Sequence, residues 1–372
     1  MAEACAKVGI VGCGAISKKY LENSKRFDAF DVVAVADARP EAAAARAAEH
    51  GAARACSVEE LLADPEVEIV VNLTPHGAHG PLGVATLEAG KSTYNEKPLC
   101  VRREDGRRML ELAAAKGLRV GAAPDTFFGG AWQTARKLID DGAIGQPIGA
   151  AACLMAYKAP QRAEPEPGPD GYVSFYRTNF FDFGVTWSFD RGPYYLTALL
   201  HLLGPVRRVT SSTAMSWAQR GFADVVRTPT HFAGILDFAN GAVGTFLITS
   251  DLHATGLPHI EIYGTEGSLR CIDPNCFGGQ LLLRKPDRRE LVPVDGAFGY
   301  NDNSRGAGIA DMAAAIRSGR PHRASGEMAY HVVDIVHALH EASDQGRHIE
   351  LASTCERPAP LPPGLEDWAI DP

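Results

Sequence analysis

The chain has 372 residues, 45 acidic and 37 basic side chains and a formal net charge of −8, and this length suffices for two ordinary domains. No apolar run reaches the ~20 residues of a membrane span, and no basic stripe alternates with aromatic side chains, so neither a membrane nor a nucleic acid is expected as a partner. Eight scattered cysteines without a C-x-x-C pair favour reduced thiols, and the N-terminal MAEACAKVGIVGCG has no secretory pattern, so a cytoplasmic protein is expected.

Strand and helix patterns alternate over the first third of the chain. Five segments are typical of buried strands: KVGIVG, DVVAVAD, VEIVVNLT, KSTYNE and LRVGAA. The helical patterns that separate them cover residues 15–27, 40–50, 81–89 and 102–116. Buried apolar strands that alternate with helices predict a parallel, doubly wound sheet of the Rossmann type, and we expect it to form a dinucleotide-binding domain over residues 1–124.

The pattern changes after residue 124. One more helix is predicted over residues 131–141, and five later segments are typical of strands: PIGAAACLMAY, VRRVTSSTAM, THFAGILDFANGAVGTFLITS, HIEIYGTEGSLRCI and QLLLRK. Short turns join these runs, among them the Asn-Gly of FANGAV, so a large and mostly antiparallel sheet is expected. Helical patterns return over residues 308–318 and 327–343, and the Pro-rich segment 159–171 is predicted to be an extended loop. An α+β domain over residues 125–372 is therefore expected.

A variant of the dinucleotide-binding fingerprint, G-x-G-x-x-S, follows the first strand. Its predicted cofactor-binding residues are Gly12, Cys13, Gly14, Ala15 and Ile16. Small residues let the backbone approach a pyrophosphate, whose charge the helix N-terminus stabilises. A purely structural glycine turn is the alternative. The chain has no Gly-x-x-x-x-Gly-Lys, which excludes an ATP-binding P-loop.

The next strand ends at Asp37, where a carboxylate binds the ribose hydroxyls of NAD and repels the 2′-phosphate of NADP. Arg39 could accommodate that phosphate. Both residues are predicted to bind the cofactor, with NAD favoured and NADP as the alternative.

Polar residues follow the strands that come next. The predicted set near the cofactor is Leu73, Thr74, Pro75 and His76 after one strand, Glu96 and Lys97 after another, and Asp125 after the last. Ligands of open α/β sheets bind beyond the carboxyl ends of the strands, so these residues are expected around the nicotinamide. Lys97 could move protons if burial and a nearby positive ring lower its pKa, with Glu96 positioning it. A surface lysine is the alternative.

The segments GIVGCGAIS, NLTPHGAHG and YNEKPL, in this order and spacing, resemble the glucose–fructose oxidoreductase / inositol dehydrogenase / rhizopine catabolism (Gfo/Idh/MocA) family. The resemblance covers nearly the whole chain, through DRGPYYLTALLHLLGP, IEIYGTEGSL and GIADMAAAIRSGR. It implies that the first domain binds NAD or NADP. It also implies that the sheet of the second domain carries the substrate cleft on one side and often an oligomer interface on the other. A homo-oligomer, dimer or tetramer, formed through this sheet is expected.

The resemblance further implies roles for single residues. Members oxidise or reduce a secondary alcohol or carbonyl of a sugar or cyclitol, and the lysine of the EKP motif, here Lys97, belongs to the catalytic set. The bond between Lys97 and Pro98 is a candidate cis peptide. By the same resemblance His79 lies close to the nicotinamide, although a structural hydrogen bond would explain it as well.

The segment FDRGPYYLTALL departs from the family pattern at two positions. Asp190 and Gly192 match it, but Tyr194 stands where a His is usual and Thr197 where a second Asp is frequent. Tyr194 could replace the His in proton transfer if a cation lowers its pKa. We expect Lys97 and Tyr194 to flank the reacting hydroxyl. Asp190 would orient the lysine or another hydroxyl, and Thr197 would hydrogen-bond the substrate.

Helix geometry tests Tyr194 independently. A Gly-Pro pair starts the helix at residue 192 and another stops it at residue 204. Four leucines make one apolar stripe, whereas Tyr194, Thr197 and His201 fall on the opposite face, which predicts that Tyr194 faces solvent or a cleft. Packing beside the sheet is the alternative for Tyr194, and Tyr195 is expected to pack.

The remaining candidates are aromatic or titratable. The predicted substrate-binding set is Thr197, Asp125, Trp187 and His201; Trp187 could stack on a sugar ring and His201 could act as a substitute base. Asp334, His337 and Glu341 share one helix face, but a solvated face explains them better than a metal, so no metal site is expected.

We therefore expect an NAD(P)-dependent dehydrogenase or reductase of a sugar, glycoside or cyclitol. One alternative is cleavage or elimination of a glycoside with retained NAD. A second alternative is a non-catalytic sensor that binds NAD.

Overall fold

The computed structural model describes residues 5–51, 54–160 and 186–371, and most of the predicted Pro-rich loop lies outside them. The chain divides into two compact units. The first contains Met1–Gly129, Phe298–Tyr330 and Pro358–Pro372, and the second contains Gly130–Ala297 and His331–Arg357. This division differs from the single boundary predicted after residue 124, because two late segments pack with the first unit. Among the described residues, no helix has the length and apolar character needed to cross a bilayer.

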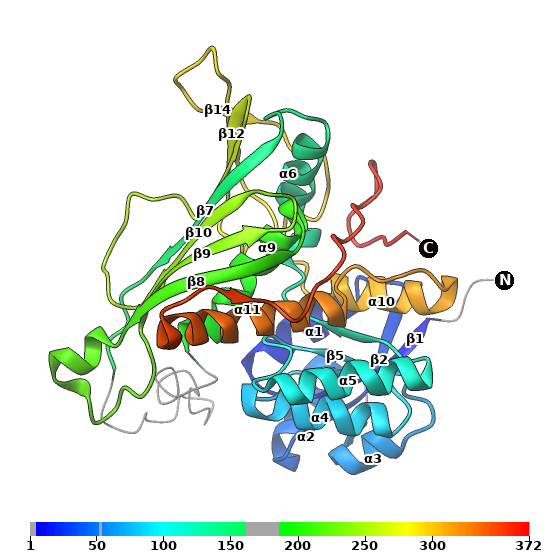
Figure 1. The fold of residues 1–372 in the computed structure, drawn as a ribbon. Helices are drawn as coiled ribbons and strands as arrows, with labels where there is room; N and C mark the ends of the chain where they lie inside the picture. The colour runs from blue at the N-terminus through cyan, green and yellow to red at the C-terminus, as the bar shows by residue number, and fades with distance from the viewer. Residues whose placement is uncertain (1–4, 52–53, 161–185, 372) are drawn as a thin grey trace. The chain divides into compact units, whose positions relative to one another are not determined.

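A six-stranded parallel sheet forms the first unit, with strand order β3-β2-β1-β4-β5-β6. The strands are β1 (Ala6–Val11), β2 (Phe30–Ala36), β3 (Arg54–Cys56), β4 (Ile69–Asn72), β5 (Ser92–Asn95) and β6 (Val120–Ala122). The helices are α1 (Ala15–Ser24), α2 (Pro40–His50), α3 (Val58–Ala63), α4 (His76–Glu88), α5 (Arg103–Lys116) and α10 (Ala307–Ser318), with a 3-10 turn η1 (Thr126–Phe128). The strand order reverses between β1 and β4, as in a doubly wound sheet, so the predicted Rossmann-type fold is confirmed. Figure 1 shows α4 and α5 side by side in this unit.

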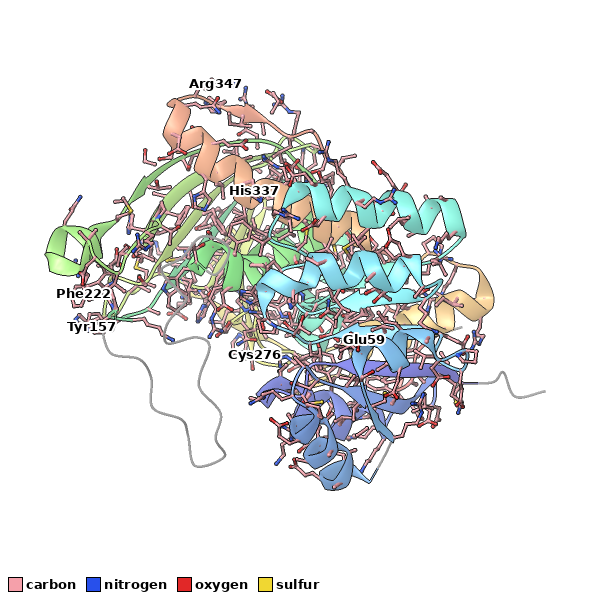
Figure 2. All side chains as sticks on the ribbon, turned by 90° about the horizontal axis from the view of Figure 1, so that it is seen from below. Glu59, Tyr157, Phe222, Cys276, His337 and Arg347 are labelled. Atoms are coloured by element: carbon pink, nitrogen blue, oxygen red, sulfur yellow. The ribbon has the colours of Figure 1, made fainter. Side chains whose placement is uncertain are left out.

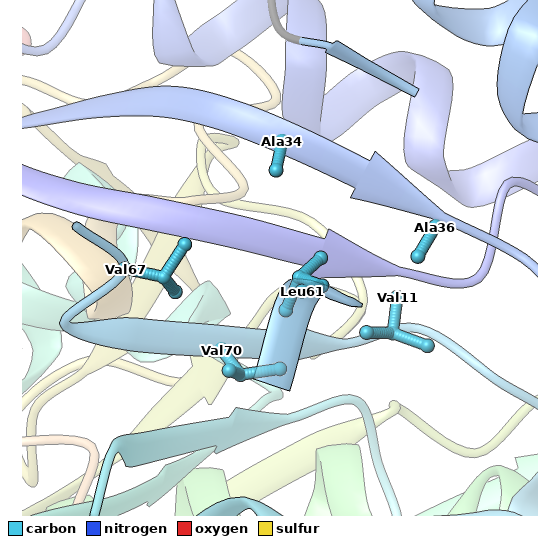
Figure 3. Close-up of a cluster of buried hydrophobic side chains, with 6 residues drawn as sticks. All are labelled: Val11, Ala34, Ala36, Leu61, Val67 and Val70. Carbon is cyan, nitrogen blue, oxygen red and sulfur yellow. The ribbon is translucent and has the colours of Figure 1, made fainter. Parts of the chain in front are cut away.

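Figure 3 shows an apolar cluster in this unit, made by Val11, Ala34, Ala36, Leu61, Val67 and Val70. Leu61 of α3 sits directly against β1. A Cβ placed on Gly9 would lie 2.8 Å from Leu61 Cδ2, so the missing side chain at Gly9 lets α3 close on the strand.

Two details of the first unit differ from the predictions. The short pair β3 and α3 was not predicted, although Ser57 and Glu60 form a capping box that the sequence SVEE could have indicated: Ser57 Oγ accepts the Glu60 N–H at 3.1 Å and Glu60 Oε2 accepts the Ser57 N–H at 2.8 Å. Helix α4 begins at His76 instead of residue 81, so Pro81 lies inside the helix. The residue before a proline usually avoids the helical conformation, but here it is helical.

A nine-stranded sheet forms the second unit, with order β14-β13-β12-β11-β7-β10-β9-β8-β15. Its strands are β7 (Pro147–Met155), β8 (Val206–Ala214), β9 (His231–Phe238), β10 (Val243–Thr249), β11 (Ile260–Gly264), β12 (Gly267–Cys271), β13 (Leu281–Arg284), β14 (Val292–Val294) and β15 (Ile349–Glu350). Neighbouring strands are antiparallel except β7 and β10, which are parallel. The mostly antiparallel sheet is confirmed; the short edge strands β14 and β15 were not predicted.

Helices cover one face of this sheet. They are α6 (Gly130–Asp140), α8 (Trp187–Asp190), α9 (Gly192–Leu203) and most of α11 (Gly326–Gln345). A π turn η2 (Ala218–Phe222) follows β8 and buries none of its residues. Gly192 of α9 approaches β10 and α11, and Leu339 of α11 packs over Gly234 of β9. Every residue of α9 is buried, so the helix has no solvent-facing side: the stripe of four leucines is only part of its apolar contact.

Late residues of the chain pack on the first unit. The buried Asp311 of α10 pairs with Arg323, whose other Nη atom lies 2.7 Å from Oδ2 of Asp371. Trp368 lies edge-on to Phe27, with ring centroids 5.0 Å apart. These contacts make the late segments part of the first unit rather than an appendage of the second.

The second unit also carries an aromatic cluster near its surface. The ring of Trp217 lies 5.4 Å from the ring of Tyr157 and 5.8 Å from the ring of Phe222. Figure 2 labels Tyr157 and Phe222 near each other at the left of the view. Tyr157 is 48% exposed, in contrast to the buried tyrosines of α9.

Candidate active site

The fingerprint loop between β1 and α1 is shaped for close backbone approach. Gly12 has φ +103°, and a Cβ at this position would lie 2.6 Å from the carbonyl carbon and oxygen of Leu73, so only glycine fits. Helix α1 starts at Ala15, and no described side chain caps its N-terminus. Amide groups of the first turn are therefore available to an anion.

Asp37 lies one residue beyond β2 and is tied to this loop. Its Oδ2 accepts the Cys13 N–H at 2.8 Å, and its Oδ1 accepts the Arg39 N–H at 3.0 Å. The Arg39 side chain is 52% exposed, with Nε 3.6 Å from the same carboxylate. The glycine cradle, the uncapped helix and a carboxylate beside them fit a dinucleotide, which Gly12, Cys13, Gly14 and Asp37 would hold.

Arg46 of α2 supports the loop and was not predicted. Its Nη2 donates to the carbonyl oxygens of Cys13 and Gly14 at 3.4 and 3.3 Å. Nothing in the local sequence marks this residue, because its partners lie more than thirty positions earlier.

His79 joins two loops at the carboxyl edge of the sheet. Its ring nitrogens lie 2.6 Å from the Pro98 oxygen and 2.7 Å from the Thr74 oxygen. The ring of His76 is edge-on to it, at 5.7 Å. Burial lowers the pKa of His79, and a neutral imidazole donates from only one nitrogen. The two short distances show that His79 makes a structural hydrogen bond, which was the alternative to a role at the nicotinamide.

Lys97 lies just beyond β5 and is buried, with 6% of its surface exposed, so the alternative of a surface lysine does not describe it. Its backbone N–H donates to Glu96 Oε2 at 2.9 Å, and the Tyr20 hydroxyl donates to Glu96 Oε1 at 3.1 Å. The peptide bond between Lys97 and Pro98 is cis, as the sequence suggested. Lysine is rarely fully buried, and its place just beyond the carboxyl end of β5 makes Lys97 a candidate for the site.

Asp125 has a role that the sequence analysis did not foresee. Its carboxylate is 1% exposed, and Oδ2 accepts the backbone N–H groups of Gly306 and Gly308 at 2.8 and 3.1 Å. Burial raises its pKa. These bonds satisfy donors at the start of α10, so the described contacts assign Asp125 to the fold and none of them points to a substrate.

In the second unit, a cavity of about 160 Å³ brings together predicted and unpredicted residues. Trp187 and Tyr194 line it, as do Arg191, Tyr195, Asp273 and Asn275. The Tyr195 hydroxyl lies 2.7 Å from Nδ1 of His259. Tyr195 was expected only to pack, and the turn that carries Asp273 and Asn275 gave no signal because it lies some eighty residues further along the chain.

Asp190 is buried beside this cavity, with its Oδ2 3.1 Å from Nε of Arg191. The Arg191 guanidinium also lies 5.9 Å from the centre of the Trp187 ring. Asp190 therefore holds an arginine of its own unit. This contact was not foreseen, because Arg191 fills the variable position of the family pattern.

Thr197 and His201 are enclosed by the second unit. Thr197 is 4% exposed and His201 is fully buried. The His201 carbonyl accepts hydrogen bonds from Arg136 at 3.0 Å and Arg357 at 2.9 Å. Burial and the two arginines hold the pKa of the His201 imidazole well below its usual range. The described contacts give no support to His201 as a substitute base.

A larger hollow of about 570 Å³ lies at the turn between β11 and β12. It is lined by the turn glycines and by Arg284, Lys285, Arg288 and Arg289. None of the predicted site residues lines it, and it is open to solvent, so its size does not make it the candidate site.

Two family models match the chain in succession. The first, the GFO/IDH/MocA oxidoreductase family with an NAD-binding Rossmann fold, matches residues 6–123. The second, the GFO/IDH/MocA C-terminal domain, matches residues 132–270. Together they span most of the chain.

Known relatives and solved structures agree with these models. A 1,5-anhydro-D-fructose reductase of Ensifer adhaerens is 27% identical over 78% of this chain and 84% of its own length. The scyllo-inositol 2-dehydrogenase (NADP(+)) of Bacillus subtilis is 24% identical over 79% of this chain and 82% of its own. A levoglucosan dehydrogenase in complex with NADH and L-sorbose has the same fold, with a TM-score of 0.78, 21% identity and coverage of 94% of this chain and 99% of that one.

Proposed function

The chain belongs to the Gfo/Idh/MocA oxidoreductase family, and from that premise we propose that it transfers a hydride between NAD and a secondary alcohol or ketone of a sugar, glycoside or cyclitol. The buried Lys97 at the carboxyl end of β5 carries the proposal. It stands where ligands of open α/β sheets bind. The sugar and inositol activities named for relatives support the substrate class.

The cofactor site supports NAD as the preferred cofactor. Bound NAD supplies the hydride acceptor for alcohol oxidation. Gly12 and the amides of the loop would hold its pyrophosphate, and Asp37 would bind ribose hydroxyls and disfavour a 2′-phosphate. The exposed Arg39 leaves NADP as the weaker choice.

Lys97 and Tyr194 are the proposed proton-transfer residues. The substrate hydroxyl gives its proton to one of them as the carbon is oxidised, and receives it back in the reverse direction. Asp190 acts through Arg191 as a positioning residue. Thr197 is the weakest member of the proposed set, since it is enclosed in α9. Lys97 belongs to the first unit and Tyr194 to the second.

Steady-state formation of NADH with a panel of sugars, glycosides and cyclitols tests the proposal. The expected result is NADH release with at least one of these alcohols, and a loss of about 10²- to 10⁴-fold in that rate after Lys97→Ala. Cleavage of aryl glycosides without net NADH would instead indicate chemistry with retained NAD, and NAD binding without turnover would indicate a sensor. Neither alternative has support from the relatives. A homo-oligomer formed through the second sheet, and a cytoplasmic location, remain predictions.

A further inference from the structure

We propose that the cavity beside α8 and α9 binds a neutral polyhydroxyl group and excludes acidic sugars. This inference rests on the proposed function for the substrate class, sugar, glycoside or cyclitol, and adds the charge that the substrate must carry. Arg191, Tyr195 and Asp273 carry it, and all three line the cavity of about 160 Å³ within the second unit.

Arg191 supplies hydrogen-bond donors. Its Nε faces the buried carboxylate of Asp190 at 3.1 Å, and its guanidinium lies 5.9 Å from the centre of the Trp187 ring. These contacts hold the side chain while neither of its Nη atoms donates a hydrogen bond to another described residue. A guanidinium held in this way offers a fixed fork of N–H groups to two ligand oxygens.

Asp273 supplies an acceptor. Its Oδ1 accepts the backbone N–H of Asn275 at 2.9 Å, and its Oδ2 accepts no hydrogen bond from the described residues. No ion pair within 4.0 Å joins it to Arg191, although both side chains line the same cavity. Burial raises the pKa of the Tyr195 hydroxyl, the Asp273 carboxylate raises it further and the Arg191 guanidinium lowers it. Both charges therefore act on the same phenol of the cavity wall.

The balance of charge selects a neutral ligand. Asp190 lies beside Arg191, and Asp273 adds a second carboxylate, so the described lining of the cavity has no surplus of positive charge. A carboxylate or phosphate on the ligand would be repelled by Asp273. Adjacent hydroxyls suit both groups, because one oxygen accepts from Arg191 while the neighbouring O–H donates to Asp273. The Tyr195 phenol, bonded to His259, adds a neutral polar contact.

Matched pairs of neutral and acidic sugars test this selection. Binding of D-glucose and D-glucuronate, and of D-galactose and D-galacturonate, is measured by isothermal titration with the full chain saturated with NADH. The variants are Asp273→Asn, which removes the charge at constant size, and Arg191→Met. Arg288→Met, on an exposed arginine outside the cavity, is the matched control, and NADH affinity reports an intact first unit.

We expect the wild type to bind at least one neutral sugar about tenfold or more tightly than its acid, Asp273→Asn to reduce that ratio by about tenfold, and Arg191→Met to weaken neutral binding by about tenfold or more. Equal or tighter binding of the acid, an unchanged ratio in Asp273→Asn, or no binding of either sugar overturns the inference. NADH formation with uronates as the preferred substrates would overturn it and leave the proposed function intact. Selective binding of the neutral sugar without turnover would leave the inference intact and overturn the proposed function.

Discussion

The Asp37 carboxylate accepts a hydrogen bond from the backbone N–H of Cys13 at 2.8 Å, so one side chain both orders the fingerprint loop and stands ready for the cofactor. Asp37→Ala removes this bond and the ribose contact together. We expect the KM for NAD to rise about 10- to 100-fold, and the preference for NAD over NADP to shrink because Arg39 remains. Asp31→Ala, at an exposed acid of β2, is the control. An unchanged ratio of the two KM values would show that Asp37 does not select the cofactor.

The variant Lys97→Ala tests the proposed proton-transfer role of the buried lysine. Lys97→Ala is expected to lower kcat by about 10²- to 10⁴-fold, the range of general acid–base catalysis. The affinity for NADH, measured by fluorescence titration, should change little, because the pyrophosphate and ribose contacts lie elsewhere in the unit. Lys116→Ala, at an exposed end of α5, provides the matched change. Turnover that survives in Lys97→Ala would remove this residue from the catalytic set.

Tyr194 is tested by loss of one oxygen atom. Tyr194→Phe keeps the ring that packs in α9 and deletes the hydroxyl, so thermal stability should hold while kcat falls about 10²-fold. Tyr195→Phe, next to it on the same helix, is the comparison. If Tyr194→Phe has undiminished turnover at every pH, the tyrosine does not replace the usual histidine.

His331 makes the stability of the second unit depend on pH. Its Nε2 accepts the Val206 N–H at 3.1 Å, and its Nδ1 lies 2.8 Å from Ser353 Oγ, which donates to Asp334 at 2.7 Å. Burial lowers the pKa of His331 to about 4. Because the folded value lies below the unfolded one, the contribution is complete above pH 6.5. It is lost as the pH falls toward 4, by up to about 3 kcal/mol.

Unfolding by urea at pH 7.5 and pH 5 measures this effect. His331→Gln should have a lower free energy of unfolding than the wild type at pH 7.5. This difference should narrow at pH 5, where the low pKa of His331 destabilises the folded wild type. His340, whose pKa burial also lowers to about 4, remains in both proteins and so cancels in the comparison. If both proteins lost the same free energy of unfolding between pH 7.5 and pH 5, His331 would not be the source of the pH dependence.

The first sheet was predictable because buried parallel strands leave unbroken apolar runs. KVGIVG and DVVAVAD became β1 and β2, and α2 occupies Pro40–His50, where it was predicted. The fingerprint glycine was predictable for a related reason: its spacing follows from the loop geometry that Gly12 adopts. Both features depend on residues that are close together in the sequence, so the sequence pattern indicates them.

What could not be predicted depends on contacts between distant segments. Asp125 binds amides some 180 residues later, and Asp273 reaches the cavity of α9 only through the order of strands in the second sheet. The pattern of α9, with leucines on one face and polar residues on the other, was misleading because the whole helix is buried. A helix covered on every side buries its polar residues as well, so periodicity does not reveal which face is enclosed.

The attachment of α10 to Asp125 has a consequence for how the protein is made. On the ribosome, the first 129 residues emerge long before Gly306 and Gly308 exist, so the buried carboxylate lacks these amide partners until residues 130–297 of the second unit have been synthesised. The six strands of the N-terminal sheet are therefore complete, but the sheet lacks α10 while residues 130–306 are translated. A fragment cut after residue 129 would keep the fingerprint loop and lack the helix that Asp125 anchors.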